Sequence, residues 1–305
     1  MSDAARVAAG PFGLVAPAGP LHDAGLDAGL DAAATLGIAV AAFERAPLTA
    51  GAGAWHLAGT DAERAARLAA AARSTPAGIW MARGGFGSAR TLAALGADAL
   101  DALPPTPIWG FSDGTALVAA WARRGRPAWH APPLVQLPRL DAASRERLLA
   151  AMQHGEVADL ESLSPISCGT AQGPLAGGNL CVLGSLVGTP WAAELRGAIV
   201  VLEDVGEPAY KVDRLLTQLR LAGAFDGVVG LVYGAFTDVP EAEEPLIARV
   251  LDAFAADLGV PAARGLPVGH GAANAALPFG RGTGHVATLD VRPGGAALRV
   301  ARARS

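Results

Sequence analysis

The stretch Gly110-Phe111-Ser112-Asp113-Gly114 decides how the first half of the chain is expected to fold. A short apolar run at 107–109 precedes it, and a run typical of a helix follows at 115–121. Strand, sharp turn and helix are the context in which a G-x-S-x-G pattern is typical of a nucleophile elbow. The flanking glycines permit a turn that other residues would obstruct, so we expect the Ser112 hydroxyl to project from the sheet edge.

Length and composition narrow the class of protein. With 305 residues the chain is long enough for two domains, each with a substantial core. A hydrophobic content of 51% against 17% charged residues excludes a disordered or fibrous chain. The net charge of -4 provides no basic surface, so nucleic acid is not an expected partner.

Cysteine use and the apolar runs indicate the compartment. Cys168 and Cys181 form no disulfide framework and no C-x-x-C zinc pattern, which favours a reducing cytosol and predicts no metal site. The N-terminus lacks a signal-peptide pattern because Pro11, Gly13 and Pro17 interrupt any apolar core. No uninterrupted apolar stretch reaches the ~18 residues that span a bilayer. We therefore expect a cytoplasmic protein without membrane contact.

Strands alternate with helices along the first third of the chain. The strand candidates lie at 12–16, 38–43, 78–81 and 107–109, and the helix candidates at 24–36, 60–73, 88–95 and 115–121. Thr60 and Glu63 have the spacing of a capping box at the start of the second helix. This order predicts an α/β fold with a doubly wound parallel sheet.

The alternation of strand and helix candidates is interrupted once, and this interruption divides the chain into three parts. We predict an N-terminal α/β domain at 1–135, an interdomain linker with a helix at 136–165, and a C-terminal domain at 166–305. The last part alternates strands and helices up to residue 258 and then becomes rich in glycine and proline, with short strands at 284–291 and 296–300. The C-terminal domain is therefore expected to be mixed, with an antiparallel portion.

A serine needs an imidazole to take its proton before it can attack a carbonyl. Among the six histidines His270 stands out, because the glycines on both sides leave its ring room to approach another group. A loop histidine bonded to the backbone is the alternative. His130 follows a strand after the elbow helix, where it either lines the same cleft or makes a structural hydrogen bond.

A third group should orient the imidazole and stabilise its cation. Glu203 and Asp204 directly follow a buried strand, and catalytic groups of open α/β sheets gather at such strand ends. Pleating sends the two side chains to opposite sides, so at most one is expected to face the histidine. Capping of the helix that begins near Pro208 is the alternative role for either carboxylate.

Backbone amides are the expected donors to an oxyanion. The amide of Asp113 follows the nucleophile and starts a helix, and Gly84 or Gly85 in the preceding glycine-rich turn supplies the second donor. This turn lacks both the P-loop pattern and the G-x-G-x-x-G register, so a phosphate-binding role is not favoured.

The motifs resemble those of the LD-carboxypeptidases, a family of serine peptidases, and they run in order over nearly the whole chain. They are Val15-Ala16-Pro17-Ala18-Gly19-Pro20, Arg83-Gly84-Gly85-Phe86-Gly87 with Arg90, Gly110-Phe111-Ser112-Asp113, Gly177-Gly178-Asn179-Leu180 with Gly188-Thr189-Pro190, Leu202-Glu203-Asp204 with Tyr210, Asp213-Arg214 and Gln218-Leu219, and Gly269-His270 with Leu277-Pro278-Phe279-Gly280.

The resemblance implies Ser112 as the nucleophile, Glu203 as the acid and His270 as the base, and it decides between Glu203 and Asp204. It implies a flavodoxin-like N-terminal domain that carries the serine and a swivelling β/β/α C-terminal domain that carries the other two residues. It also implies a homodimer without metal or cofactor. The implied reaction releases terminal D-alanine from a small peptide, the cytoplasmic murein tetrapeptide, by cutting an L-to-D peptide bond.

Several residues bear on the substrate. With Asp113 and Gly85 as the oxyanion donors, Arg83 beside Gly84 is the candidate for binding the free carboxylate of the substrate, since a guanidinium binds a carboxylate through two hydrogen bonds. Pinning the glycine turn is the alternative role for Arg83. His130-Ala131-Pro132-Pro133 departs from the more usual histidine-glycine-proline-methionine of the family, and alanine replaces a common serine at position 18. Because of these departures, the sequence does not identify the substrate.

Three other functions compete with this one. The family also includes the microcin-C immunity hydrolases, which cut peptide–nucleotide amides, but the linker here lacks an aromatic-rich insertion. An α/β-hydrolase esterase shares the elbow and the order serine, acid, histidine, but the chain lacks the histidine-glycine-glycine motif and we expect two domains instead of one long sheet. A non-catalytic two-domain binding protein would use the same cleft without a serine–histidine pair.

Overall fold

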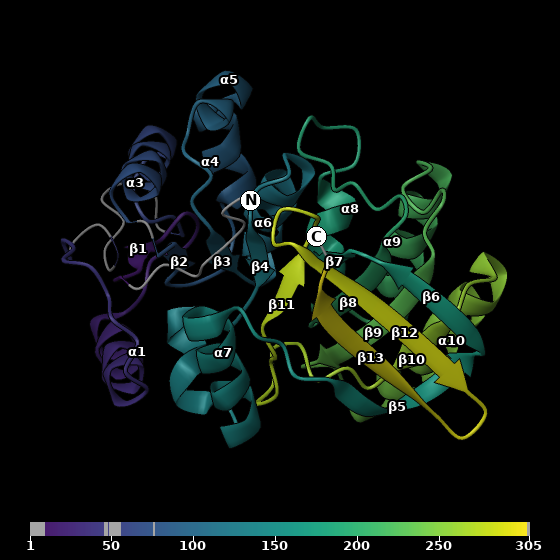
Figure 1. The fold of residues 1–305 in the computed structure, drawn as a ribbon. Coiled ribbons are helices and arrows are strands. Elements are labelled where there is room, and N and C mark those ends of the chain that lie inside the picture. The colour runs from purple at the N-terminus through teal and green to yellow at the C-terminus, as the bar shows by residue number, and fades with distance from the viewer. Residues whose placement is uncertain (1–9, 46–47, 49–55, 76, 304–305) are drawn as a thin grey trace.

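The computed structural model of the chain describes residues 10–45, 48, 56–75 and 77–303. Within these residues the strands form one 13-stranded sheet in the order β1-β2-β3-β4-β11-β7-β8-β9-β10-β5-β13-β12-β6. Figure 1 shows the N-terminal half on the left and the C-terminal half, with its yellow β12–β13 hairpin, on the right.

The N-terminal half has the predicted doubly wound arrangement. Its parallel strands are β1 (Gly13–Val15), β2 (Ile79–Met81), β3 (Ile108–Gly110) and β4 (Ala128–His130). Its helices are α1 (Asp23–Thr35), α3 (Asp61–Ser74), α4 (Ser88–Leu95), α5 (Ala97–Asp101) and α6 (Thr115–Arg123). The strand expected at 38–43 is reduced to one parallel bridge between Val40 and Phe12.

Strand pleating explains why helices cover both faces of this sheet. Trp80, Trp109 and Trp129 point to one face, where they share a core with α1 and α7 (Ala142–His154). Trp109 and Trp129 stack there with ring centroids 4.5 Å apart. Ile79 and Ile108 point to the other face, into a core with α3, α4 and α6.

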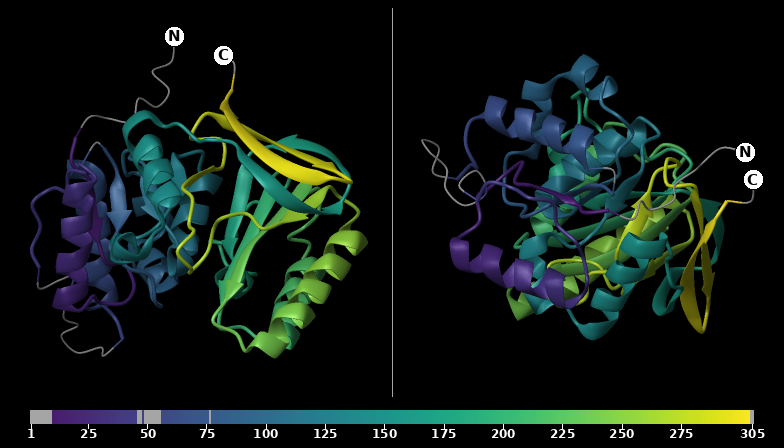
Figure 2. Two further views of the ribbon diagram at one scale, coloured as in Figure 1. Left: turned by 90° about the horizontal axis from the view of Figure 1, so that it is seen from below. Right: turned by 60° about the vertical axis from the view of Figure 1, so that its left-hand side comes forward.

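The C-terminal half is mixed, as predicted. Its parallel strands are β7 (Leu175–Asn179), β8 (Ile199–Val205), β9 (Gly230–Thr237) and β10 (Ala262–Arg264). The antiparallel portion is formed by β5 (Leu160–Ser167), β6 (Gly169–Gly173), β12 (His285–Arg292) and β13 (Gly295–Arg302). The helices are α8 (Leu180–Ser185), α9 (Ala209–Leu221) and α10 (Glu244–Leu258). In the left view of Figure 2 the strands lie between these helices and the yellow hairpin.

One short strand joins the two halves. Strand β11 (Leu277–Phe279) runs antiparallel to β4, where Leu277 pairs with His130, and parallel to β7, where Phe279 pairs with Leu175. Figure 1 shows it between them. The expectation that the chain contains no single long sheet is therefore wrong, because three residues after the His270 loop bridge the two sheet edges. The domain limits 1–135, 136–165 and 166–305 stay a prediction.

Local sequence signals set several helix ends. The capping box of α3 is confirmed: the Thr60 hydroxyl accepts from the Glu63 amide at 3.2 Å, and the Glu63 carboxylate accepts from the Thr60 amide at 2.8 Å. The Asp141 carboxylate caps α7 by accepting from the Ser144 amide at 2.7 Å. Each cap satisfies amides that the helix itself leaves without a partner.

A buried methionine explains why the elbow is flanked by glycines. A Cβ atom at Gly110 would lie 2.3 Å from Sδ of Met81, and one at Gly114 would lie 2.4 Å from the same sulfur. Met81 is fully buried on β2, so it cannot move away into solvent. The two glycines of the G-x-S-x-G pattern thus let the elbow pack directly on the neighbouring strand.

We predict that Gly110→Ala lowers the free energy of unfolding by about 1–3 kcal/mol, because the added methyl overpacks a filled core. Urea titration measures this change. Gly294→Ala is the matched control, since a Cβ atom there meets no other atom within 4 Å, and it should change stability by less than ~0.5 kcal/mol. Equal effects of the two substitutions would contradict the steric explanation.

Candidate active site

Ser112 lies on a strained turn between β3 and α6. It opens the 3-10 turn η1 (Ser112–Gly114) and has a φ of +60°, a value that non-glycine residues rarely adopt. Such strain persists only where the surrounding structure enforces it, and it is common at functional sites. The elbow that the sequence predicts is thus present, with a partly exposed serine.

The structure brings the three predicted triad residues together. Nε2 of His270 lies 2.9 Å from Oγ of Ser112, and Nδ1 of the same ring lies 2.9 Å from Oε2 of Glu203. Ser112 comes from the N-terminal half, Glu203 from β8, and His270 from the loop between β10 and β11. Both distances are those of good hydrogen bonds.

The partners fix the tautomer of His270. A carboxylate oxygen only accepts, so Nδ1 carries the proton and donates it to Glu203. Nε2 is then left with a lone pair that accepts the hydroxyl proton of Ser112. Glu203 is fully buried, and among the described residues its second oxygen has no hydrogen-bond partner. Its negative charge is therefore available to stabilise a cation on the ring.

Asp204 points away from the triad, as the pleat predicts. Its carboxylate accepts from Nδ2 of Asn179 at 2.8 Å and from the amide of Cys181 at 2.9 Å. Burial raises the pKa of Asp204 to about 6, and the negative charge of nearby Glu203 acts in the same direction. Asp204 thus fixes the connection between β7 and α8, and Glu203 alone faces His270.

The glycine-rich turn after β2 packs on the elbow. A Cβ atom at Gly84 would lie 3.0 Å from Cβ of Ser112 and 3.5 Å from the amide nitrogen of Asp113, so this position tolerates only a glycine comfortably. Gly85 follows with a φ of +105° and is exposed. The turn and the Asp113 amide therefore lie on the same side of the nucleophile.

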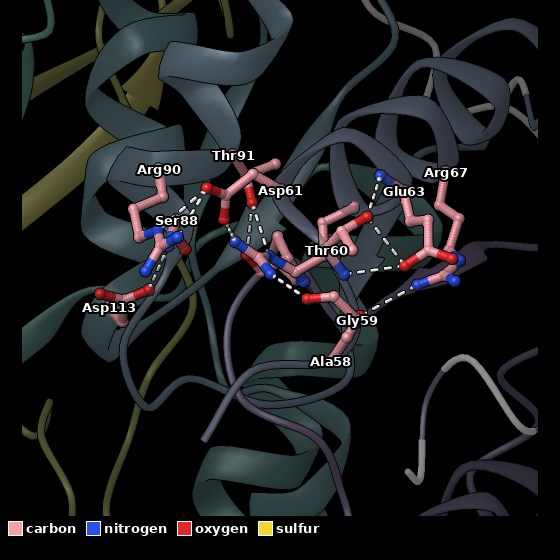
Figure 3. A network of polar contacts seen from close by, with 12 residues as sticks. Ala58, Gly59, Thr60, Asp61, Glu63, Arg67, Ser88, Arg90, Thr91 and Asp113 are labelled. Carbon is pink, nitrogen blue, oxygen red and sulfur yellow. Dashed lines mark hydrogen bonds and ion pairs between the residues drawn. The ribbon is translucent and has the colours of Figure 1, made fainter. Parts of the chain in front are cut away.

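The side chain of Asp113 has a structural role. Its carboxylate accepts from the Ser88 amide at 2.8 Å at the start of α4 (Figure 3). Burial raises the pKa of Asp113 above its usual range, and hydrogen bonds from Ser88 and the Gly87 amide partly offset this effect. The contact ties the elbow to the end of the glycine turn.

A buried arginine, which the sequence analysis did not identify, holds the loops around the turn. Arg64 on α3 is almost fully buried, donates from Nε to the carbonyl of Pro17 at 3.1 Å, and pairs through Nη2 with Asp61. Thr91 on α4 donates to the same Pro17 carbonyl at 2.6 Å, and Arg90 also pairs with Asp61 (Figure 3). Only the tertiary fold brings these groups together, so the sequence offered no signal beyond the i, i+3 spacing of Asp61 and Arg64.

Part of the Arg83 guanidinium already binds a backbone carbonyl of the protein. Its Nη1 donates to the carbonyl of Pro20 at 2.5 Å, and the amide of Gly19 donates to the carbonyl of Gly84 at 3.2 Å. The arginine thus secures the loop after β1 against the glycine turn, close to the structural role that the sequence left open. Its role in binding a substrate carboxylate stays a prediction.

The described ranges contain neither a metal site nor a helix that could span a membrane. No group of three or more His, Cys, Asp or Glu side chains has an arrangement that could hold a metal ion in residues 10–45, 48, 56–75 and 77–303. Over the same residues, no helix has both the length and the apolar composition needed to cross a bilayer.

Two family models together cover most of the chain. The LD-carboxypeptidase N-terminal domain matches residues 12–131, and the LD-carboxypeptidase C-terminal domain matches residues 172–283. The chain belongs to the LD-carboxypeptidase family. The resemblance seen in the motifs is thereby confirmed, and an LD-carboxypeptidase is a hydrolase of the peptidase class.

Individual relatives agree with this assignment. The chain is 37% identical to the murein tetrapeptide carboxypeptidase of Pseudomonas aeruginosa over 219 residues, which cover 67% of this chain and 70% of that one. The muramoyltetrapeptide carboxypeptidase of Oxalobacter formigenes has a similar structure, with a TM-score of 0.80, 24% identity and coverage of 97% and 100% of the two chains. The microcin C7 self-immunity protein MccF gives a TM-score of 0.79 at 21% identity and 99% coverage of both. This chain therefore has the same fold as these two proteins.

His130 is buried among aromatic rings, one of which also contacts His270. Its ring packs edge-on against Phe111, with centroids 5.2 Å apart, and is tilted by 31° against Phe279, with centroids 5.3 Å apart. Phe111 in turn contacts His270, with centroids 4.4 Å apart. Complete burial lowers the pKa of His130 to about 3, and the side chain of Asn274 offsets this only in part. This burial among rings favours a structural role over a place in the cleft, and the structural hydrogen bond that the sequence left open stays a prediction.

We predict that His130 makes the folded protein sensitive to acid. A histidine of the unfolded chain takes up a proton near pH 6.5, whereas the buried ring stays neutral down to about pH 3. The unfolded state therefore binds more protons in this window, and the free energy of unfolding falls as the pH is lowered.

Urea unfolding of the wild type and of His130→Gln measures this effect. The stability advantage of the wild type over the variant should shrink by about 2 kcal/mol between roughly pH 7.5 and pH 5. His154→Gln, at an exposed histidine, is the control and should leave the pH dependence of the wild type unchanged. An advantage of His130 that stays constant with pH would contradict the prediction, because it would show that the ring takes up its proton at the same pH in the folded and the unfolded protein.

Proposed function

We propose that this LD-carboxypeptidase is a serine peptidase that releases terminal D-alanine from a murein tetrapeptide, with Ser112, His270 and Glu203 as its triad. The observation that supports the proposal most is the pair of 2.9 Å contacts that His270 makes with the other two residues. Family membership and the name of the Pseudomonas aeruginosa relative support the peptide substrate.

The reaction begins when Nε2 of His270 takes the proton of Ser112 and Oγ attacks the scissile carbonyl carbon. Glu203 stabilises the imidazolium that forms. His270 then gives the proton to the departing amine of D-alanine, and an acyl-enzyme remains on Ser112. Water, deprotonated by the same ring, hydrolyses this ester and regenerates the hydroxyl.

The amides of Asp113 and Gly85 bind the oxyanion in this proposal. The close packing of Gly84 on the elbow supports it, because the glycine turn approaches the Asp113 amide from the side of the nucleophile. Loss of one such donor typically costs about 2.7–4 kcal/mol of barrier. Arg83 receives the free carboxylate of the substrate through the guanidinium nitrogens that do not face Pro20.

We propose the cytoplasm as the compartment and a homodimer as the assembly. Cys168 and Cys181 are both free, as is usual in a reducing compartment. The homodimer rests on the resemblance to the family.

We predict that Ser112→Ala lowers the rate of D-alanine release by about 10⁴–10⁶-fold, because the variant lacks the hydroxyl that would form the acyl-enzyme. Mass spectrometry of murein tetrapeptide incubated with purified protein measures the released amino acid. Ser74→Ala, at an exposed serine at the end of α3, is the matched control and should keep the wild-type rate. Equal rates for Ser112→Ala and the wild type would show that the nucleophile is another residue.

The same assay separates the competing substrates. Rapid hydrolysis of a peptide–nucleotide amide without D-alanine release would favour a microcin-C-like hydrolase. Rapid hydrolysis of simple aryl esters without cleavage of either substrate would favour an esterase, and binding without turnover would favour a non-catalytic protein.

We further predict that two neighbouring carboxylates differ sharply in their effect on the rate. Glu203→Gln should lower the rate by about 10⁴-fold, because an amide no longer stabilises the imidazolium and can impose the wrong tautomer on His270. Asp204→Asn, one residue along β8, should lower it by less than ~10-fold, because Asp204 contacts α8 instead of the ring. A larger loss in Asp204→Asn than in Glu203→Gln would reverse the assignment of the acid.

A further inference from the structure

The proposed base lies on a segment without regular structure. Residues 265–276, which connect β10 to β11, form neither helix nor strand, and His270 is in the middle of them. The contacts of its ring with Ser112 and Glu203 do not by themselves fix the backbone that carries the ring. A triad requires that backbone to be held within a fraction of an ångström, so some other group must hold it.

The side-chain amide of Gln136 holds the peptide groups on both sides of His270. Nε2 of Gln136 donates to the carbonyl of Gly269 at 3.0 Å and to the carbonyl of Gly271 at 3.1 Å. Both N–H bonds of this amide are thus used on the residues that flank the histidine. Gln136 lies on the 3-10 helix η2 (Leu134–Arg139) and is 3% exposed. The bond to the Gly269 carbonyl is therefore shielded from water, and the bond to the Gly271 carbonyl is partly shielded.

A second buried amide fixes the orientation of the first. Nδ2 of Asn274 donates to Oε1 of Gln136 at 2.8 Å, and Oδ1 of Asn274 accepts from the amide of Gly269 at 3.4 Å. Carbonyl oxygens only accept and a backbone amide only donates, so both side chains have one possible orientation. Asn274 is fully buried, and its backbone amide donates to Oγ of Ser144 on α7 at 3.0 Å.

These contacts attach the His270 loop to the segment that links the two halves. Besides Ser144, the amide of Asp141 donates to the carbonyl of Ala272 at 2.9 Å. The η2–α7 segment packs in the core of the N-terminal half, which also carries the elbow of Ser112. The base is therefore held against the same body that carries the nucleophile.

We propose that Gln136 is a positioning residue that sets the approach of His270 to Ser112, with Asn274 fixing the orientation of its amide. The proposal rests on the serine-peptidase function proposed above. Gln136 acts through the backbone of residues 269–271, so its loss should slow proton transfer without weakening substrate binding.

The test compares Gln136→Met with the wild type in two assays. The first is the labelling rate of Ser112 by a fluorophosphonate, in which an Oγ–P bond forms, fluoride leaves and Nε2 of His270 takes the serine proton. The second is the release of D-alanine from murein tetrapeptide, with kcat and KM measured separately. Gln218→Met is the matched control, because the Gln218 amide also donates to a backbone carbonyl, that of Gly184 at 3.3 Å, but lies on α9.

We predict that Gln136→Met lowers both the labelling rate and kcat by roughly 10- to 100-fold while KM changes by less than about 3-fold. Gln218→Met should match the wild type in both assays. Circular dichroism checks the fold of each variant. If Gln136→Met does not fold, Gln136→Asn decides the question, because it keeps the amide but is too short to reach both carbonyls.

Folded Gln136 variants that label and turn over at the wild-type rate would overturn the proposal, and so would a loss confined to KM. The labelling assay separates this outcome from a failure of the proposed function. If the wild type is labelled at Ser112 but releases no D-alanine, the substrate assignment is wrong, and the ratio of labelling rates still tests Gln136. If Ser112 of the wild type is not labelled, the nucleophile assignment is wrong and the positioning role is wrong with it.

Discussion

One imidazole must lie within hydrogen-bonding distance of groups from both halves of the chain. His270 contacts Ser112 on one side and Glu203 on the other, each at 2.9 Å. A fully buried carboxylate and a strained serine would each be costly without a purpose, because an isolated buried charge and a left-handed backbone both destabilise a fold. In the proposed triad, His270 contacts both of these groups. The rest of the structure holds these three side chains close to one another.

Strand β11 and the η2–α7 segment supply that structure. Strand β11 pairs with a strand of each half, so the two halves share one sheet. The loop that precedes β11 carries His270, and η2 and α7 bind this loop through buried side chains. The interface between the halves is therefore formed by hydrogen bonds as well as by apolar packing. The proposed site of this LD-carboxypeptidase therefore needs the arrangement of the two halves as much as it needs the elbow.

The predictable features are those with a local signal. Short sequence patterns were enough to identify the glycines around Ser112, the glycines beside His270 and the capping box of α3. The same is true of Glu203 and Asp204, which were expected just after a strand and lie near the end of β8. Strand β11 could not be predicted, because Leu277-Pro278-Phe279 is short, contains a proline and pairs only with strands distant in sequence. Gln136 and Arg64 were missed for a related reason: each acts on backbone carbonyls that only the tertiary fold brings to it. The strand expected at 38–43 gave way to a single bridge, so a local apolar run was not sufficient there.

The cooperation of Ser112 and His270 across the two halves is the central claim, and a double-mutant comparison tests it most directly. The D-alanine release rates of Ser112→Ala, His270→Asn and the double variant would be measured with murein tetrapeptide. Residues that act as one catalytic unit give losses that are far from additive. We therefore predict that the double variant is no slower than the slower single variant, within about 10-fold. Losses that multiply in the double variant would show that the two residues act independently, and would contradict a single site shared by both halves.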